Sequence, residues 1–268
     1  MGDCIKFLIS IGCFAGDCVR RGIRSICGIP LPSFYVILYY HSVRDSERAR
    51  FADQMRLLRR VATPVGTGDD IASVPGVRYC AVTFDDVFEN VLSNALPELS
   101  GQGIPATIFV TSGTMGRNAS WWPGAESRER LISAAQLRGL PNSVEIGSHT
   151  VSHPLLSRLS ECAARSELTS SRRDLENVIG RPVTVFSFPY GDVTEELIGW
   201  CREAGYRRVF TSLPFLAPFD QTTYVVGRVA VDPSESLFVF RLKLMGAYRW
   251  LPYAIALKKR MVGMTATK

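Results

Sequence analysis

The sequence predicts an α/β fold in which parallel strands alternate with helices around a closed barrel. First, about seven short apolar runs alternate with helix-like segments between residues 34 and 231, and this alternation is typical of a parallel sheet. Second, no linker, low-complexity stretch or fixed-period repeat divides the 268 residues, a length that suits one large domain. Third, no GxGxxG follows the first strand, so an open dinucleotide-binding sheet fits less well than a barrel.

The strands are predicted from continuous apolar runs, which are typical of parallel strands buried on both faces. The first is FYVILYY, residues 34–40. The others are expected, in chain order, at residues 77–84, 106–110, 143–147, 183–188, 206–211, 224–226 and 229–231.

The helices are predicted from apolar residues at helical spacing and from glycine at their ends. Phe51, Met55 and Leu58 share one side of the first helix between strands. Pro97 predicts a kink in the second of them. The expected ranges are 47–60, 87–103, 133–140, 159–180 and 194–205, with a last helix after residue 231.

Both ends of the chain are predicted to form basic amphipathic helical segments, residues 1–30 and 234–268, on either side of a barrel domain at 31–233. A cleaved signal peptide is the minor alternative for the first, because no basic segment precedes its apolar run. Two interpretations of these ends remain open. They pack on the barrel, or they attach peripherally to an anionic membrane.

Charge and cysteine content limit the partners and the compartment. The net charge is +6, yet residues 238–268 hold seven cations and no acid, so the remaining chain is near neutral. A basic stripe of the kind that binds nucleic acid is therefore not expected. A spanning helix is not expected. The seven cysteines form no CxxC pair and are predicted to be buried thiols in a reducing compartment, which indicates a cytoplasmic protein. Peripheral contact with the inner membrane face is the open alternative that the basic ends of the chain add.

Polar side chains follow four of the predicted strands at their carboxyl ends. These positions meet on one face of a barrel, where active sites of such folds lie. Each group also has a simpler explanation, as a helix cap, a satisfied histidine or a turn. Their joint placement, which includes all three histidines, favours an active site. The residues are His41, Asp85, Asp86, His149, His153, Pro189 and Tyr190.

Two histidines four residues apart and one carboxylate predict a divalent metal site, most consistent with Zn²⁺. No HExxH is present, since Thr150 and Val151 follow His149, so the metalloprotease pattern does not apply. One of the two adjacent aspartates is expected to bind the metal, and the other to take a proton from water. The spacing leaves open which aspartate takes which role.

The chain resembles the NodB-type polysaccharide deacetylases, carbohydrate esterase family 4, over roughly residues 41–231. TFDD (83–86), SHTVSHP (148–154) and FSFPYG (186–191) are similar to the first three motifs of that family. YYHSV (39–43) and GYRRVFTS (205–212) are similar to its exopolysaccharide-biosynthesis subgroup.

This resemblance implies a single domain with a distorted (β/α)7 barrel. It implies hydrolysis of an acetyl group, N-acetyl in the first instance, on an amino-sugar polysaccharide or a lipid-linked glycan. Asp85 is then the general base, and Pro189 and Tyr190 contact the substrate, with the Tyr190 backbone N–H at the oxyanion. The implied metal ligands are Asp86, His149 and His153.

The chain departs from the family at two places. Ser187 stands where the third motif carries an arginine, and the histidine of the last motif, the general acid, is missing. Arg228 is a candidate replacement for the arginine, with a surface or phosphate-contacting role as the alternative. His41 is a candidate to protonate the leaving amine or contact the substrate; a structural hydrogen bond is the alternative.

Trp121 and Trp122 follow the strand at 106–110, and Trp122 in particular is expected to stack on a sugar ring. The predicted activity is therefore a metal-dependent deacetylase. A catalytically silent glycan-binding relative and a metal-dependent amidase of small molecules remain alternatives.

Overall fold

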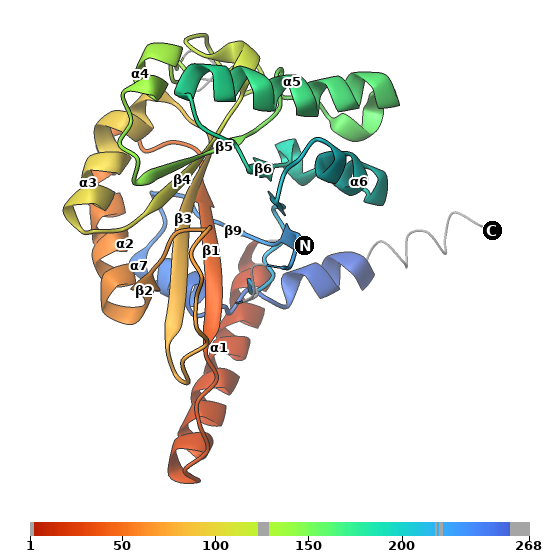
Figure 1. Ribbon diagram of the computed structural model, residues 1–268. Coiled ribbons are helices and arrows are strands. Elements are labelled where there is room, and N and C mark those ends of the chain that lie inside the picture. The colour runs from red at the N-terminus through yellow and green to blue at the C-terminus, as the bar shows by residue number, and fades with distance from the viewer. Residues whose placement is uncertain (1–2, 123–128, 218, 220–221, 258–268) are drawn as a thin grey trace.

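The computed structural model describes residues 3–122, 129–217, 219 and 222–257 (Figure 1). The strands are β1 (Phe34–Tyr40), β2 (Thr63–Pro64), β3 (Arg78–Asp86), β4 (Ala106–Val110), β5 (Val144–Ser148), β6 (Val185–Ser187), β7 (Arg208–Phe210), β8 (Val225–Val226) and β9 (Val229–Ala230). The helices are α1 (Asp3–Ile26), α2 (Arg48–Val61), α3 (Leu96–Gly101), α4 (Ala134–Arg138), α5 (Glu161–Ile179), α6 (Glu195–Glu203) and α7 (Leu237–Leu244).

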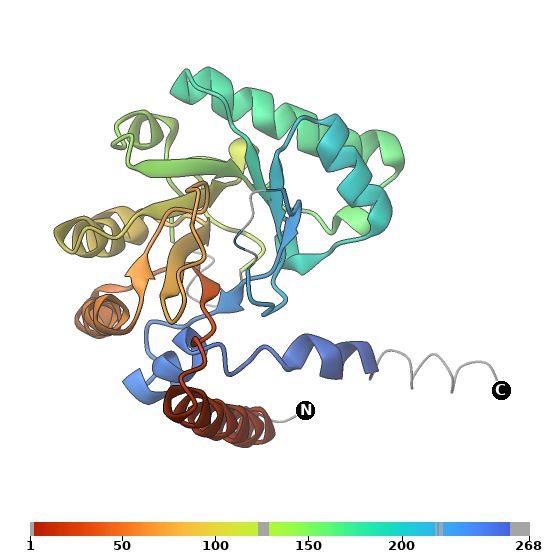
Figure 2. The same ribbon diagram turned by 60° about the horizontal axis from the view of Figure 1, so that its bottom comes forward.

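The strands form one parallel sheet in the order β8-β7-β6-β5-β4-β3-β1-β9, with β2 added beside β3. The sheet curls strongly, and helices lie around its outside (Figures 1 and 2). This arrangement confirms the predicted α/β single domain, and it is consistent with the distorted barrel.

The segment that contains β8 and β9 links the two edges of the curled sheet. β8 pairs with β7, β9 pairs with β1, and both pairings are parallel. Only Gly227 and Arg228 separate the two strands. A Cβ atom at Gly227 would lie 2.4 Å from the Leu213 carbonyl oxygen, so this close approach requires glycine. The link places Arg228 inside the fold, where its side chain is 1% exposed.

Alternate residues of the strands fill two apolar clusters. Ile37, Ala81 and Phe109 belong to the cluster on one face of the sheet, while Leu38 and Val82 belong to the larger cluster that includes helix residues. Both faces are thus buried, which explains why the strands read as continuous apolar runs instead of alternating ones.

Residues 89–101 form one continuous helical segment, close to the helix predicted over 87–103. A π-helical turn spans Val91–Ala95 and leads directly into α3. Pro97 lies in the turn that follows, and it has no N–H to donate back along the helix. The regular helix is therefore distorted next to Pro97, as the sequence predicts.

The prediction of buried cysteines is wrong for most of them. Cys80 and Cys201 are buried, but Cys13 is only partly buried. The solvent-exposed cysteines are Cys4, Cys18, Cys27 and Cys162. Cys4, Cys13 and Cys18 lie on α1, a helix that packs beside the barrel and not within it (Figure 2), so apolar character alone did not decide their burial.

The two terminal segments lie together outside the sheet (Figure 2). Helix α1 contacts α7, and Asp17 of α1 forms an ion pair with Arg249 at 2.6 Å. Residues 258–268 of the predicted C-terminal segment lie outside the described part of the chain. Among the described helices, none combines the length and the apolar character needed to cross a bilayer.

Candidate metal centre and active site

A pocket of about 320 Å³ lies where the carboxyl ends of β1, β3, β5 and β6 meet. It contains all the predicted site residues except Pro189 and Arg228. Its lining consists of Tyr39, His41, Asp85, Asp86, Trp121, Trp122, His149, His153, Phe188, Tyr190, Gly191 and Ser212. Pro189 precedes Tyr190 in a short 3-10 turn, and Arg228 lies directly behind Asp85.

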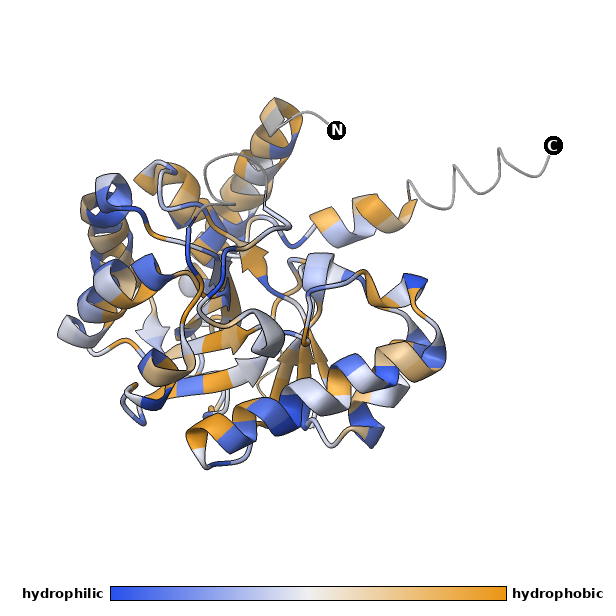
Figure 3. Cartoon of the chain, turned by 90° about the horizontal axis from the view of Figure 1, so that it is seen from above, coloured by the Kyte–Doolittle hydropathy of each residue, from blue (hydrophilic) through white to orange (hydrophobic). Residues whose placement is uncertain are grey.

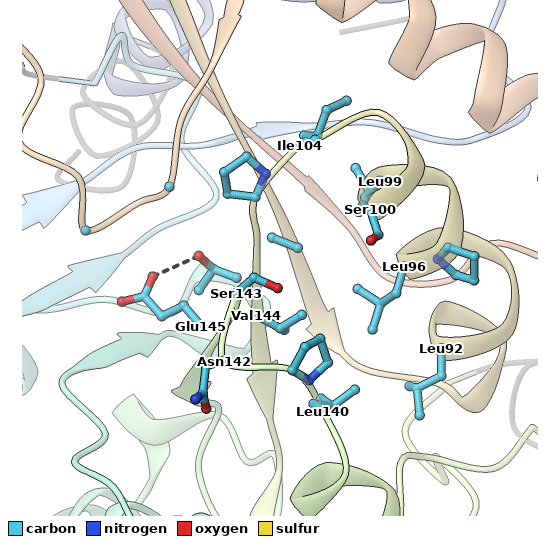
Figure 4. Close-up of a pocket in the computed structure, with 18 of the residues that line it drawn as sticks. Leu92, Leu96, Leu99, Ser100, Ile104, Leu140, Asn142, Ser143, Val144 and Glu145 are labelled. Atoms are coloured by element: carbon cyan, nitrogen blue, oxygen red, sulfur yellow. Dashed lines mark hydrogen bonds between the residues drawn. The ribbon is translucent and has the colours of Figure 1, made fainter.

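A larger hollow of about 1060 Å³ lies at the opposite end of the sheet, beside α3 and the starts of β4 and β5 (Figure 4). Leucine side chains and backbone atoms form much of its wall. Glu145 of β5 also lines it, and its carboxylate accepts a hydrogen bond of 2.9 Å from Thr107. None of the predicted site residues reaches it. The predicted site residues therefore lie at the carboxyl ends of the strands and not in this larger hollow.

Asp86, His149 and His153 form a buried triad whose ligand atoms all lie within 4.8 Å of one another. Asp86 ends β3, and the two histidines follow β5. The Asp86 Oδ1 atom lies 3.2 Å from His153 Nε2 and 3.7 Å from His149 Nε2. One carboxylate and two imidazoles around a common point are a ligand set suited to Zn²⁺ and similar ions.

The hydrogen bonds around the triad leave its inward atoms available for a cation. His149 Nδ1 donates to the Ser187 carbonyl at 2.7 Å, which leaves the lone pair of Nε2 facing the triad. Asp86 Oδ2 accepts a 2.7 Å hydrogen bond from the Trp122 indole. In the described part of the chain, the buried Asp86 Oδ1 has no hydrogen-bond partner. A buried carboxylate oxygen without a partner is costly, and a bound cation would satisfy it.

Aromatic rings surround His153. Trp121 stacks on it with ring centroids 4.5 Å apart, and Tyr190 meets it edge-on at 4.6 Å. Burial and the neighbouring His149 lower the pKa of His153 to about 4, against the opposing charges of Asp86 and Asp85. The ring is therefore neutral at pH 7, which is the form that binds metals.

Asp85, the neighbour of the metal ligand, is held by Arg228. The two terminal guanidinium nitrogens each donate to one carboxylate oxygen at 2.7 Å. Ser187 Oγ accepts from the same guanidinium at 2.6 Å and donates to Asp85 at 3.3 Å. Burial raises the pKa of Asp85, but the charge and hydrogen bonds of Arg228, with His149 and His41, outweigh it and lower the pKa to about 2. The carboxyl is ionised at neutral pH.

His41 lies on the β1 side of the same pocket. Its ring meets Trp122 edge-on with centroids 4.8 Å apart and lies 5.6 Å from Tyr39. Burial lowers the pKa of His41, although Asp86 and Asp85 oppose the shift. Trp122 thus connects His41 with Asp86, a contact that the sequence did not predict.

Several residues around the pocket have a left-handed backbone conformation. Among the described residues, the non-glycine positions with positive φ are Asp86, Val87, Thr150, His153 and Tyr190. Such conformations cost of the order of 1 kcal/mol or more each and cluster at functional sites. At Asp86 and His153 the left-handed turn occurs at the metal ligand itself. No sequence signal marks these conformations.

The curled parallel sheet carries a buried Asp–His–His triad at the carboxyl ends of its strands, a ligand set suited to a divalent cation. The family model described as polysaccharide deacetylase matches residues 73–209, slightly more than half of the chain. The protein therefore belongs to the polysaccharide deacetylase family, as the sequence motifs predict.

Individual relatives agree with this assignment. YxkH of Bacillus subtilis (strain 168) is 27% identical over 228 residues, which are 81% of this chain and 76% of YxkH. The peptidoglycan-N-acetylmuramic acid deacetylase PdaC of the same organism is 32% identical over 127 residues, 46% of this chain but only 24% of PdaC. IcaB from Ammonifex degensii has a similar structure, with a TM-score of 0.64 at 26% identity over 80% of this chain and 97% of IcaB.

Proposed function

We propose that the protein removes N-acetyl groups from an amino-sugar polysaccharide or a lipid-linked glycan. One observation carries the proposal: the ionised Asp85 lies in the same pocket as the three ligand residues, yet it is bound to Arg228 and not to the triad. The site thus holds two adjacent carboxylates in different environments, one suited to bind a cation and one suited to accept a proton.

A divalent cation, with Zn²⁺ first, would be held by Asp86, His149 and His153. When bound, it would supply Lewis-acid stabilisation and lower the pKa of water towards about 7. In the proposed reaction Asp85 accepts a proton from the water that attacks the amide carbonyl. The backbone N–H of Tyr190, beside Pro189, donates to the oxyanion of the tetrahedral intermediate. The C–N bond then breaks, and acetate and a free amine leave.

The leaving amine needs a proton, and His41 is our candidate to deliver it. Its ring lines the pocket that holds Asp85, which is the position required of a group that contacts the substrate. Arg228 is proposed to replace the family arginine, since it makes two hydrogen bonds to Asp85.

The substrate proposal rests on the family and on the pocket walls. PdaC is named for the deacetylation of N-acetylmuramic acid in peptidoglycan, and the pocket of this chain offers the flat rings of Trp122 and Tyr190. Tyr190 is 58% exposed, so its ring is accessible to a sugar. We also propose, as a separate point, that the protein is cytoplasmic.

Acetate and amine release from metal-loaded protein tests this function. With an oligosaccharide that carries both N-acetyl and O-acetyl groups, acetate and new amine should appear in equal amounts, whereas an O-acetyl esterase would release acetate and no new amine. A silent glycan-binding relative would bind the oligosaccharide and release neither product. An amidase of small molecules would cleave short acetylamides and leave the oligosaccharide intact.

A further inference from the structure

Helix α1 turns an apolar stripe towards solvent. Every aliphatic side chain of this stripe is at least 39% exposed, and Ile26 reaches 88%. The stripe spans about 33 Å at 1.5 Å per residue, and no charged residue interrupts it, because Gly12, Ala15 and Gly16 fill its middle. Its aliphatic members are Ile5, Leu8, Ile9, Val19, Ile23 and Ile26.

The opposite side of α1 is fixed to the rest of the chain. Ser10 is fully buried and accepts a 3.0 Å hydrogen bond from the Trp250 indole. Asp17 receives two hydrogen bonds from Arg249, at 2.6 and 2.8 Å. Phe7 meets Phe238 with ring centroids 6.1 Å apart. A surface helix normally buries its apolar residues, but these contacts leave the aliphatic stripe of α1 exposed. Figure 3 shows hydrophobic residues along this helix at the edge of the molecule.

Cationic side chains flank the apolar stripe of α1. At 100° per residue, Arg20 lies next to the stripe, and Lys6 and Arg24 lie about 40° farther round on the same flank. Arg21 lies on the opposite side of the helix from the stripe. The acid Asp17 is already paired with Arg249. A second copy of this chain on the stripe would bring two such cationic edges together, whereas anionic lipid would neutralise them.

We infer that the outer face of α1 is a docking surface for an anionic lipid bilayer. The aliphatic stripe lies at the boundary of the acyl chains, and the neighbouring cations lie among the headgroups. This inference combines the two interpretations of the N-terminal segment: one side of α1, with Ser10, Asp17 and Phe7, packs on the protein, and the aliphatic stripe binds lipid.

The docked helix lies close to the catalytic pocket. Cys4, Lys6 and Phe7 of its first turns line a pocket of about 670 Å³ together with Ser212. Ser212 also lines the catalytic pocket, so the two cavities adjoin. A protein bound through α1 would hold its active site near the lipid surface.

Vesicle flotation of the full chain tests the inference. Vesicles of phosphatidylcholine, with and without phosphatidylglycerol, are compared for the wild type and for a matched pair of variants, Val19→Glu on the stripe and Val74→Glu outside it. Val74 is also exposed, at 46%. Circular dichroism and thermal unfolding establish that both variants fold.

Wild type should float with the anionic vesicles and much less with pure phosphatidylcholine. Val19→Glu should weaken binding at least about tenfold, and Val74→Glu should bind like the wild type. Three results would overturn the inference: absence of wild-type flotation, equal binding by the two variants, or a wild-type dimer in solution that Val19→Glu separates, since a second copy would then cover the stripe.

Discussion

The guanidinium of Arg228 meets the carboxylate of Asp85 through two hydrogen bonds of 2.7 Å, between residues 143 positions apart in the chain. Arg228 stands between the two short strands that link the edges of the sheet, and Asp85 precedes the last residue of β3. Ser187, which occupies the place of the family's usual arginine, hydrogen-bonds to both groups. The positive charge beside Asp85 is therefore supplied by Arg228, which lies outside the third motif, where the family carries its arginine.

Arg228→Met should cost stability and activity together. It leaves the Asp85 carboxylate buried without its cation, and breaking a buried pair from one side typically costs about 3 kcal/mol. Urea unfolding measures this loss, and acetate release should fall at least about tenfold. Arg165→Met, which removes an exposed partner of Glu161, is the control and should unfold like the wild type. A stable, fully active Arg228→Met protein would contradict the proposed role.

The stability of the fold should depend on the ionisation of Asp85. Its pKa is lowered to about 2 in the folded protein, below the ordinary value of about 3.9. Ionised Asp85 thus stabilises the fold by about 2 kcal/mol above pH 4, and this contribution is lost as the pH falls through about 2. The free energies of unfolding of wild type and Asp85→Asn should therefore converge between about pH 4 and pH 2. If the difference between the two free energies of unfolding stays constant over this range, the lowered pKa of Asp85 is contradicted.

Trp122→Phe separates two roles of this tryptophan. The variant keeps an aromatic ring but removes the indole donor to Asp86 Oδ2. If the hydrogen bond orients the ligand, zinc affinity should fall about tenfold, as measured by competition with a chelator. Trp121→Phe is the matched control, because the Trp121 indole nitrogen has no hydrogen-bond partner in the described chain. Unchanged zinc affinity with a raised KM for the glycan would instead support only the stacking role.

The three histidines should divide into two ligands and one non-ligand. His149→Ala and His153→Ala should each weaken metal binding at least about a hundredfold, more than the loss of an outer hydrogen bond. His41→Ala should retain the metal and lose turnover. Metal content after dialysis and metal affinity by titration measure the difference. Loss of the metal from His41→Ala would place His41 in the ligand set and contradict its proposed role as proton donor.

Much of the fold and the metal triad could be predicted because the signals are local. A buried parallel strand reads as an apolar run, and the residue after it lies at a known face of the barrel. This logic brought both aspartates and the two histidines to one face, and the family resemblance implied Asp86 as the ligand. The structure places the ligand atoms of Asp86, His149 and His153 within 4.8 Å of one another.

The remaining features depend on contacts that local patterns do not encode. Nothing in the spacing of Val225–Ala230 reveals that one half pairs with β7 and the other with β1. The left-handed conformations of Asp86 and His153 likewise follow from the surrounding packing. The sequence predicts only that Trp122 stacks on a sugar ring, and the folded chain adds its hydrogen bond to Asp86.

Acetate release by metal-loaded wild type and Asp85→Asn, on acetylated chito-oligosaccharides and poly-N-acetylglucosamine, tests the central claim most directly. We predict that wild type releases acetate from at least one of these glycans. Asp85→Asn should bind the metal equally well and react at least about a hundredfold more slowly. Equal rates for the two proteins, or no acetate from metal-loaded wild type on either glycan, would contradict the account.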